Sequence, residues 1–360
     1  MTRRCNSSNE LLSKPVLPIK TEGRAFAVYA LVLSFLLSFL LSGCTKIQKK
    51  TVSLFALDTY VTITVEGKRA DQAVEEAVTL LTELENQLSR TKEGSEIWKL
   101  NHSSKEEPVE LSPGTIGLLA MTCLYSEKTD GRFDPTIAPL MDLWGFGTDG
   151  AHVPGDEEIE EELTHVDYRG IHILEGNLAY VDEGVQVDLG GVAKGYIGKM
   201  LMNRIRLYYP NKVVLDLGGN VVVFDSAEGT SVGVISPLDS SKLCVIYDLP
   251  RGYENSIVTS GAYERYFEEN GVRYGHIMDT RTGRPVETDL LSATVINDQG
   301  EIADILSTAF FAMGCEEAKK LAISERIDCI LCADNGTLWV SSTLKGKVHE
   351  QEGWTIEYFG

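Results

Sequence analysis

Apolar and polar positions follow recognisable periods along most of the chain. YVTITV (60–65) alternates between apolar and polar residues, which predicts a half-buried strand. A helix is expected over 115–128, because Ser112-Pro113 is a helix start signal and Asp130-Gly131 is a stop signal. Between these two segments, apolar residues recur at helical spacing and predict an amphipathic helix: Ala73, Ala77, Leu80, Leu81, Leu84 and Leu88.

Short apolar runs dominate the middle and the end of the sequence. Between 170 and 260 they are separated by Gly, Asp and Asn turns, and further helices are expected near 301–313 and 316–324. Strands and helices mix without strict alternation, so we expect an α+β fold rather than a doubly wound sheet. The expected strands are IHILE, LAYVD, KVVLDL, NVVVFD, SVGVISP, LCVIYDL, SIVTS, LSATVI, CILCA and TLWVSS.

The N-terminal segment is expected to lie outside the fold. Basic residues precede an apolar run over 25–41, which is typical of a secretory signal; a retained membrane anchor is the alternative. The run ends in Leu-Ser-Gly-Cys44, which resembles the lipobox of bacterial lipoproteins. We therefore expect a cleaved signal peptide over 1–43, a lipid on Cys44, a tether over 44–51 and one domain over 52–360, held at the extracytoplasmic face of the cell membrane.

Charge narrows the class of ligand. The 360 residues carry a formal net charge of −20, and removal of 1–43 makes the balance more acidic. Such a chain is not suited to nucleic acid, whose phosphates require a basic face. Any phosphate ligand would need a metal ion or a local positive charge.

The cysteines give no disulfide framework. The five that would remain after processing and lipidation are odd in number and irregularly spaced. Cys329 and Cys332 have the spacing of a redox or zinc half-site, but they lie in the apolar run IDCILCA and have no second pair. We expect buried strand cysteines.

Two glycine-rich stretches are either phosphate-binding turns or turns without a ligand. Gly145-Phe-Gly147-Thr-Asp-Gly150 matches the dinucleotide fingerprint, but no strand precedes it and no helix follows, so we interpret it as a turn. VQVDLGGVAKGY (185–196) is better placed. A strand VQV, a turn and a helix from Val192 would present backbone N–H groups and Lys194 to an anion. The alternative is a glycine turn required only by packing, and a Walker-type loop is not supported.

Three further groups have candidate chemistry. Asp304 and Thr308 lie four apart in an expected helix beside Ser307, and such oxygens suit magnesium; alternatively the hydroxyls bond to their own helix. His276, at the end of an expected strand, is a candidate general base or a packed structural histidine. The proline-rich and aromatic loop over 131–146 could hold a planar ring or form a hydrophobic corner.

Together these stretches resemble the bacterial ApbE family, the FAD:protein FMN transferases. Each motif alone is weak, but six occur in the family's order and span roughly 57–314. They are GRFDPTIAPL with LWGF (131–146), DLGGVAKGY (188–196), LDLGG (215–219), VTSGAYERY (258–266), HIMDTRTG (276–283) and ADILST (303–308).

The resemblance implies mixed sheets with flanking helices, and an active site in the cleft between subdomains. FAD would bind with its isoalloxazine ring near Leu57 and the loop of Arg132, Phe133 and Asp134. Its diphosphate would lie near Asp188, Gly191, Lys194, His276 and Ile277. Magnesium would be held by the Gly191 carbonyl, Asp304 and Thr308, with Ser307 where some members carry a second aspartate.

Two positions depart from the family pattern. Leu57-Asp58-Thr59 replaces the usual Met-Gly-Thr, and Thr91 stands where some members have a tyrosine. The implied reaction is magnesium-dependent transfer of FMN from FAD to a threonine or serine of an extracytoplasmic acceptor, with release of AMP. Lys194 and Asp188 would serve the diphosphate, and His276 would take the proton.

Other functions stay open from the residues alone. Water in place of the acceptor would make the site an FAD pyrophosphatase that gives FMN and AMP. A flavin-binding lipoprotein without turnover is a second alternative, although Tyr263 stands where an acceptor threonine would follow Thr259-Ser-Gly-Ala262. A solute-binding lipoprotein would need two similar α/β lobes, which the strand-rich middle does not indicate.

Overall fold

The computed structural model describes residues 46–263 and 265–360, and 47–360 form one compact unit. The predicted signal peptide and the predicted lipidation site Cys44 lie outside the described residues. Within the described part, no helix has the length and apolar character needed to cross a membrane. The first strand begins at Gln48, so the tether expected over 44–51 overlaps the folded unit.

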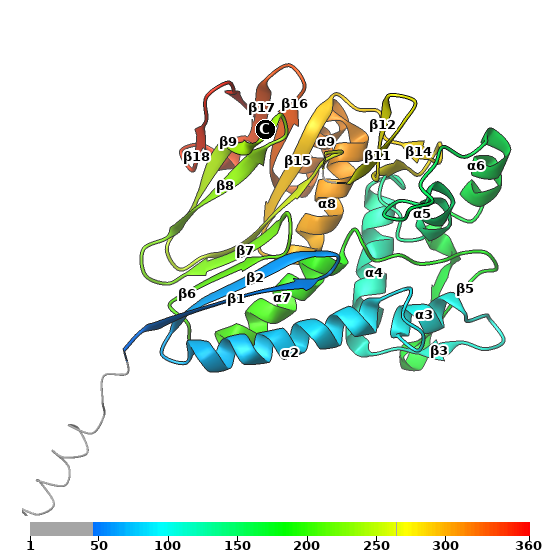
Figure 1. Cartoon of the computed structure of the whole chain (residues 1–360), viewed down its shortest axis with the longest axis horizontal. Coiled ribbons are helices and arrows are strands. Elements are labelled where there is room, and N and C mark those ends of the chain that lie inside the picture. Colours follow the sequence, from blue (N-terminus) through cyan, green and yellow to red (C-terminus); the bar gives the residue numbers. More distant parts are fainter. Residues whose placement is uncertain (1–45, 264) are drawn as a thin grey trace, which may run out of the picture. The chain divides into compact units, whose positions relative to one another are not determined.

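A nine-stranded sheet forms the centre of the unit (Figure 1). Every neighbouring pair in it is antiparallel except the last, which is parallel. In spatial order its strands are β1 (Gln48–Ala56), β2 (Thr59–Gly67), β6 (Lys212–Asp216), β7 (Asn220–Asp225), β10 (Glu254–Ser260), β15 (Leu290–Asn297), β16 (Asp328–Ala333), β17 (Thr337–Ser341) and β19 (Thr355–Phe359).

A three-stranded sheet packs on one face of this central sheet. It has the order β18 (Val348–Glu350), β9 (Asp239–Leu249) and β8 (Thr230–Ser236). The two sheets share a separate apolar cluster, to which Val223, Val245 and Ile330 belong. Alternating buried positions along β8 fit this half-buried setting, because only one of its faces meets the core.

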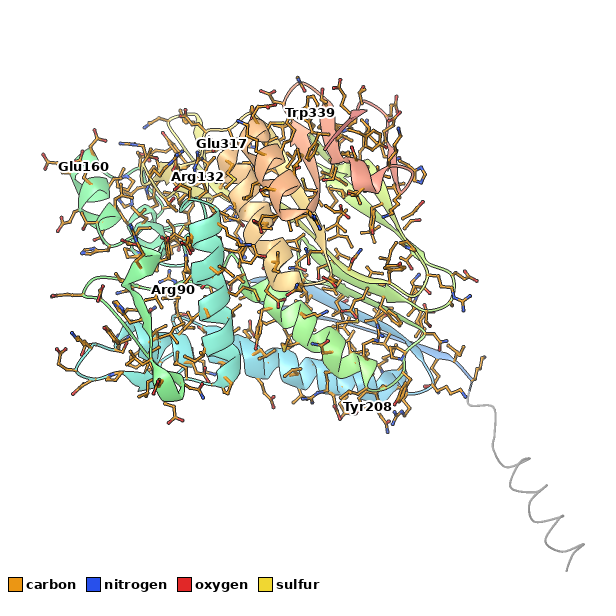
Figure 2. All side chains as sticks on the ribbon, turned by 180° about the vertical axis from the view of Figure 1, so that it is seen from behind. Arg90, Arg132, Glu160, Tyr208, Glu317 and Trp339 are labelled. Carbon is orange, nitrogen blue, oxygen red and sulfur yellow. The ribbon has the colours of Figure 1, made fainter. Side chains whose placement is uncertain are left out.

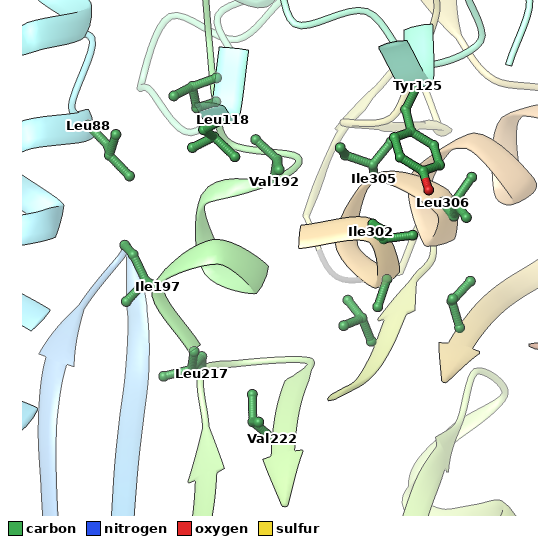
Figure 3. Packing of buried hydrophobic residues seen from close by; sticks show 14 of the residues in the cluster. Leu88, Leu118, Tyr125, Val192, Ile197, Leu217, Val222, Ile302, Ile305 and Leu306 are labelled. Atoms are coloured by element: carbon green, nitrogen blue, oxygen red, sulfur yellow. The ribbon is translucent and has the colours of Figure 1, made fainter. Parts of the chain in front are cut away.

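Helices cover the other face of the central sheet: α2 (Ala70–Leu88), α7 (Ala193–Arg206), α8 (Gly300–Met313) and α9 (Cys315–Glu325). Their apolar sides and the inner face of the sheet form the largest core cluster. Figure 3 shows part of this cluster, in which Ile197 of α7 and Ile305 of α8 are labelled. Both side chains are fully buried.

The remaining elements lie beside the ends of α7 and α8. The helices are α3 (Glu96–Asn101), α4 (Pro113–Lys128), α5 (Ala138–Trp144) and α6 (Asp156–Leu163). The small sheets are β3 (Val109–Glu110) with β5 (Leu178–Val181) and β4 (Ile171–Ile173), the hairpin β11 (Tyr266–Glu269) with β12 (Val272–Gly275), and the pair β13 (Met278–Asp279) with β14 (Arg284–Pro285).

Helices α7 and α8 touch backbone to backbone at two glycines. A Cβ atom on Gly195 would overlap the carbonyl oxygen of Gly300, and a Cβ atom on Gly300 would overlap the carbonyl oxygen of Gly195. Only glycine allows so close an approach. The contact brings the first turn of α7 directly onto the first turn of α8.

The α+β prediction is confirmed, and the expected helices and most expected strands are present. The prediction of a strand at VQV (185–187) is wrong. Only Gln186 forms an isolated bridge there, to Ile137. The side chain of Asn101 takes the place of a partner strand, since it donates to the Val187 carbonyl at 2.9 Å and accepts from the Val187 N–H at 2.7 Å. Val185 and Val187 are buried although they belong to no sheet, which explains why apolar and polar residues alternate in this stretch.

Two smaller predictions are also confirmed. The stretch that matches the dinucleotide fingerprint is a turn, because Gly145 ends α5 in the left-handed conformation with φ 67°. Cys329 and Cys332 are buried free thiols in β16. The sulfur of Cys332 lies 3.7 Å from that of Cys244 on β9, at the interface of the two sheets.

Candidate active site

A cavity of about 230 Å³ opens where the loop before α5 and the first turn of α7 face β10 and α8. Five of its residues were predicted to lie near a diphosphate: Asp188, Gly191, Lys194, His276 and Ile277. Asp304 and Thr308 of the predicted metal site line the same cavity. Two motifs that are more than a hundred residues apart in the sequence therefore meet at one point.

The turn before α7 is held by the carboxylate of Asp188. One oxygen accepts the N–H of Gly190 at 2.7 Å, and the other accepts from Nε of Arg90 at 2.8 Å. Arg90 also makes two hydrogen bonds to Asp142, at 2.6 and 2.9 Å. The acidic side chains raise the pKa of Arg90, the Asp142 hydrogen bond having the largest effect. Asp188 is thus fixed by an arginine from the segment after α2, labelled in Figure 2.

The first turn of α7 is capped by a residue of another helix. Val192 at its N-cap makes no side-chain hydrogen bond, but the N–H of Gly195 donates to Oδ2 of Asp304 at 2.7 Å. Asp304 is 3% exposed, and burial raises its pKa, opposed by the charge of Lys194 and the hydrogen bond from Gly195. A buried carboxylate at a helix N-terminus is stabilised by the helix dipole. The contact of α7 and α8 therefore positions an acidic group in the cavity wall.

Lys194 supplies the local positive charge that an acidic chain needs for a phosphate ligand. It lines the cavity, and it makes no ion pair with any carboxylate in the described part of the chain. It lies close enough to influence the titration of both Asp304 and His276. A lysine without an ion-pair partner at a helix N-terminus is suited to bind an anion.

His276 lies between β12 and β13, where it lines the cavity. Its Nδ1 atom is 3.1 Å from the carbonyl oxygen of Arg265, which also accepts the backbone N–H of His276 at 3.1 Å. Because a carbonyl can only accept, Nδ1 carries the proton and Nε2 keeps a lone pair. Burial, then the charges of Arg265 and Lys194, lower the pKa of His276 to about 4. The imidazole is neutral near pH 7 and can accept a proton.

Hydroxyl groups gather beside Asp304. The Ser260 hydroxyl lies 2.9 Å from that of Ser307 and 3.3 Å from that of Thr308. The Ser307 hydroxyl also donates to the Asp304 carbonyl at 2.9 Å. Thr308 lines the cavity, whereas Ser307 is fully buried and lies behind it. Ser307 is therefore the one predicted metal ligand that the structure does not bring to the cavity.

The loop after α4 was predicted to lie near the isoalloxazine ring, and its side chains have different roles from one another in the structure. Phe133 and Ile277 are buried apolar walls of the cavity. Asp134 lines it too, but its carboxylate accepts hydrogen bonds from Thr136 and the N–H of Tyr168. Burial raises the pKa of Asp134. The carboxylate of Asp134 thus stabilises the loop.

Arg132 also borders the cavity but uses its charge elsewhere. Its guanidinium donates to the Ala312 carbonyl at 2.8 Å and to Glu317 at 2.7 Å. Arg132 and Glu317 are labelled side by side in Figure 2. The guanidinium therefore ties the loop to α8 and α9.

Two predicted flavin contacts do not line the cavity. Leu57 lies in the turn between β1 and β2, where its N–H donates to Glu85 at 2.6 Å. The hydroxyl of Thr91 is 3.2 Å from that of Ser89. The neighbour of Thr91, Arg90, reaches the site instead by way of Asp188.

Several lining residues were missed from the sequence. They include Thr259, Ser260, Arg265, Met278 and Thr280. The motifs VTSGAYERY and HIMDTRTG contain them, so the resemblance identified the two segments but assigned no role to these residues. No sequence pattern pointed to Arg90 as a site residue, because nothing near it in the sequence indicates an ion pair with a residue 98 positions later.

The predicted magnesium site fits the geometry in part. Gly191, Asp304 and Thr308 line one cavity, and only one oxygen of the buried Asp304 carboxylate has a hydrogen-bond partner in the described chain. No cluster of three or more His, Cys, Asp or Glu suited to a metal occurs among 46–263 and 265–360. A single carboxylate with neutral oxygens suits magnesium, which keeps several waters and binds substrate phosphates.

Two further cavities border the first. One of about 400 Å³ shares Met141, Arg265 and His276 with it and is lined by Phe146 and Phe267, among others. Another, of about 680 Å³, shares Lys194, Thr259 and Arg265. Arg265 borders all three. The volume around His276 is thus much larger than the first cavity alone.

Comparison with known proteins places the chain in one family. Residues 57–331 match the model of the ApbE family, and the chain belongs to that family. It is 30% identical over 298 residues to the FAD:protein FMN transferase of Treponema pallidum, covering 77% of this chain and 82% of that one.

A second relative and a solved structure give the same result. The FAD:protein FMN transferase of Klebsiella pneumoniae is 31% identical over 266 residues, which are 73% of this chain and 83% of that one. The crystal structure of the ApbE protein from Thermotoga maritima superposes with a TM-score of 0.77 at 32% identity, covering 85% of this chain and all of that one.

Proposed function

We propose that the chain transfers FMN from FAD to a threonine or serine hydroxyl of an extracytoplasmic acceptor protein. Family membership supports the transfer of FMN to a protein. The single observation that carries the chemistry is the cavity in which Lys194, without an ion-pair partner among residues 46–263 and 265–360, lies beside a neutral His276. One group binds an anion and the other accepts a proton, which are the two needs of phosphoryl transfer to a hydroxyl.

The reaction replaces the phosphoanhydride bond of FAD with a phosphoester bond to the acceptor. The acceptor oxygen forms a bond to the FMN-side phosphorus of FAD, and the bond from that phosphorus to the bridging oxygen breaks. AMP leaves with the bridging oxygen, and the hydroxyl proton moves to Nε2 of His276. The products are AMP and an acceptor that carries FMN through a phosphoester.

Positioning and charge supply most of the catalysis in such a reaction. Lys194 neutralises charge on the diphosphate, and Asp188, fixed by Arg90, holds the turn that presents the N–H groups at the start of α7. Phe133 and Ile277 give an apolar wall suited to the isoalloxazine ring. The aromatic lining of the 400 Å³ cavity is suited to a second ring.

Magnesium belongs to this proposal. The Gly191 carbonyl, Asp304 and Thr308 would hold it, with Ser307 supporting Thr308 through Ser260. Bound there, the ion would neutralise charge on the diphosphate oxygens. The buried carboxylate of Asp304 supports the assignment, because an uncompensated buried anion is costly without a cation nearby.

Membrane attachment is the second part of the proposal. The Leu-Ser-Gly-Cys44 sequence supports removal of 1–43 and lipidation of Cys44, which would place 47–360 outside the cytoplasmic membrane. A membrane-bound electron-transfer subunit or another lipoprotein would then be within reach as acceptor.

A product assay tests the proposed reaction. The full chain, purified in detergent, is incubated with FAD, magnesium chloride and membranes from a strain that lacks its gene. Transfer predicts a flavin-fluorescent protein band on a denaturing gel and AMP in equal amount to bound flavin. Free FMN with AMP and no fluorescent band would instead mean hydrolysis, and neither product would mean binding without turnover.

A further inference from the structure

The 680 Å³ cavity lies at the open end of the sandwich between the two sheets. Its walls come from the turn between β1 and β2, the turn between β6 and β7, and strands β8 and β10. The apolar cluster that fills the rest of the sandwich includes Val234 and Ile257, which also line this cavity. The space is therefore a continuation of the core that the protein's own side chains leave open.

This cavity meets the active-site cavity at one shared wall. Lys194, Thr259 and Arg265 line both. His276 lies on the active-site side of that wall, with Nδ1 held by the Arg265 carbonyl. A chain that enters through the larger cavity would thus bring a side chain to Lys194 and the lone pair of His276.

Strand β8 gives the larger cavity an unpaired edge. It pairs with β9 on one side, and on the other side it pairs with no strand of the described chain. Residues 232–235 of β8 line the cavity. A free strand edge with its row of N–H and C=O groups is a template for an extended segment, which adds to the sheet as a further strand.

An apolar rim borders the same opening. Tyr60 is 78% exposed and Ile235 49%, and both line the cavity. Phe55, 66% exposed, packs edge to face against Tyr60 with ring centroids 5.7 Å apart. Exposed aromatic and aliphatic side chains that gather beside a cavity are typical of a protein contact site.

From this arrangement we propose that the 680 Å³ cavity is the docking groove for the acceptor protein's flavinylation segment. The segment binds extended along the free edge of β8 and delivers its hydroxyl past Lys194 to His276. This inference rests on the proposed transfer function. It assigns FAD and the acceptor to opposite sides of the wall formed by Lys194, Thr259 and Arg265.

A charged substitution on the rim tests the groove. Ile235→Arg is compared with Leu238→Arg, since Leu238 is 68% exposed in the same hairpin but does not line the cavity. The full-length variants are assayed with membranes from the gene-deletion strain at limiting acceptor. We expect Ile235→Arg to slow formation of the fluorescent band at least tenfold with FAD affinity unchanged, and Leu238→Arg to stay within twofold of wild type.

Three results would overturn the proposal that the 680 Å³ cavity is the docking groove. One is an Ile235→Arg variant that labels the acceptor at the wild-type rate. The second is a tenfold loss of FAD affinity in that variant, because FAD rather than the acceptor would then occupy the cavity. The third is a wild-type chain that labels no protein, which removes the proposed function itself and the groove with it.

Hydrogen exchange gives a second measurement that does not depend on a substitution. The flavin-carrying peptide is identified by mass, synthesised without flavin and added to the full chain. Amides of 232–235 should exchange at least tenfold more slowly with the peptide than without it. Unchanged exchange in β8, with the peptide still flavinylated, would contradict strand addition.

Discussion

His276 shows how a neighbouring carbonyl fixes the position of the proton on an imidazole ring. The Arg265 carbonyl fixes the proton on Nδ1, so Nε2 is the ring nitrogen that keeps a lone pair. Burial and two nearby cations keep the ring uncharged. In the proposed transfer, this ring is therefore ready to take a proton before the acceptor hydroxyl arrives.

Removal of this imidazole should stop transfer and spare FAD binding. We expect His276→Ala to lower the transfer rate about 10²–10⁴-fold, the usual contribution of a general base. His152→Ala is the matched control, because its Nδ1 also contacts a backbone carbonyl, that of Gly150, but the side chain is exposed and does not line the cavity. Stopped-time measurement of AMP release, with FAD titration, checks both; a wild-type rate in His276→Ala would remove the base assignment.

The pH dependence of the rate should follow the lowered pKa of His276. The neutral ring is the active form, and its pKa lies at about 4 rather than at its usual 6.5. The rate should therefore be constant from pH 7 down to about pH 5.5 and fall as the pH drops through 4. A profile of kcat/KM against pH with its acid limb at 6.5 would show that the ring is not desolvated as described.

At the scale of elements, the contact of α7 and α8 at Gly195 and Gly300 organises the site. It places Asp304 against the N-terminus of α7, where the carboxylate accepts the Gly195 N–H. A change at this contact should therefore disturb both stability and the proposed magnesium site.

Gly195→Ala should lower the free energy of unfolding by about 1–3 kcal/mol, because the added methyl group overlaps the Gly300 carbonyl oxygen. Gly117→Ala in α4 is the control, since a Cβ there meets nothing within 4 Å and alanine favours a helix by about 0.5–1 kcal/mol. Thermal unfolding of the two variants should shift in opposite directions. Equal shifts would mean that the close helix contact is absent.

Much of this element structure could be predicted from hydrophobic periods, and the exception is informative. The helices at α2, α4, α8 and α9 and the short strands follow from apolar spacing and turn residues. VQV has the period of a strand but obtains its hydrogen bonds from Asn101, a side chain 86 positions earlier. Periodicity reports burial, and it does not distinguish a partner strand from a partner side chain.

The site was predictable where its residues belong to compact motifs. Asp188, Lys194, His276 and Asp304 meet in one cavity as expected. Arg90 and Ser260 could not be assigned roles, because their roles depend on pairings across the fold. Leu57 and Thr91 were expected at the site by resemblance alone, and Ser307 also from its position beside Asp304 and Thr308. None of the three lines the cavity.

At the scale of the whole molecule, the proposal is that Cys44 attaches the chain to the membrane. We expect Cys44→Ala to release the chain from the membrane fraction into the soluble extracytoplasmic fraction or to leave it unprocessed with 1–43 attached. FAD binding by the purified variant should stay within twofold of wild type, because Cys44 precedes the compact unit 47–360. Cell fractionation with immunodetection checks the first point, and an unchanged distribution of a processed chain would contradict lipidation.

The proposed function requires that FMN is transferred from FAD to a protein hydroxyl in one cavity. The most direct test is peptide mass spectrometry of the acceptor after incubation with the full chain, FAD and magnesium. Our account predicts one threonine or serine that gains the mass of FMN less water, with one AMP released for each residue modified. An acceptor of unchanged mass, while FAD is consumed to free FMN and AMP, would contradict it.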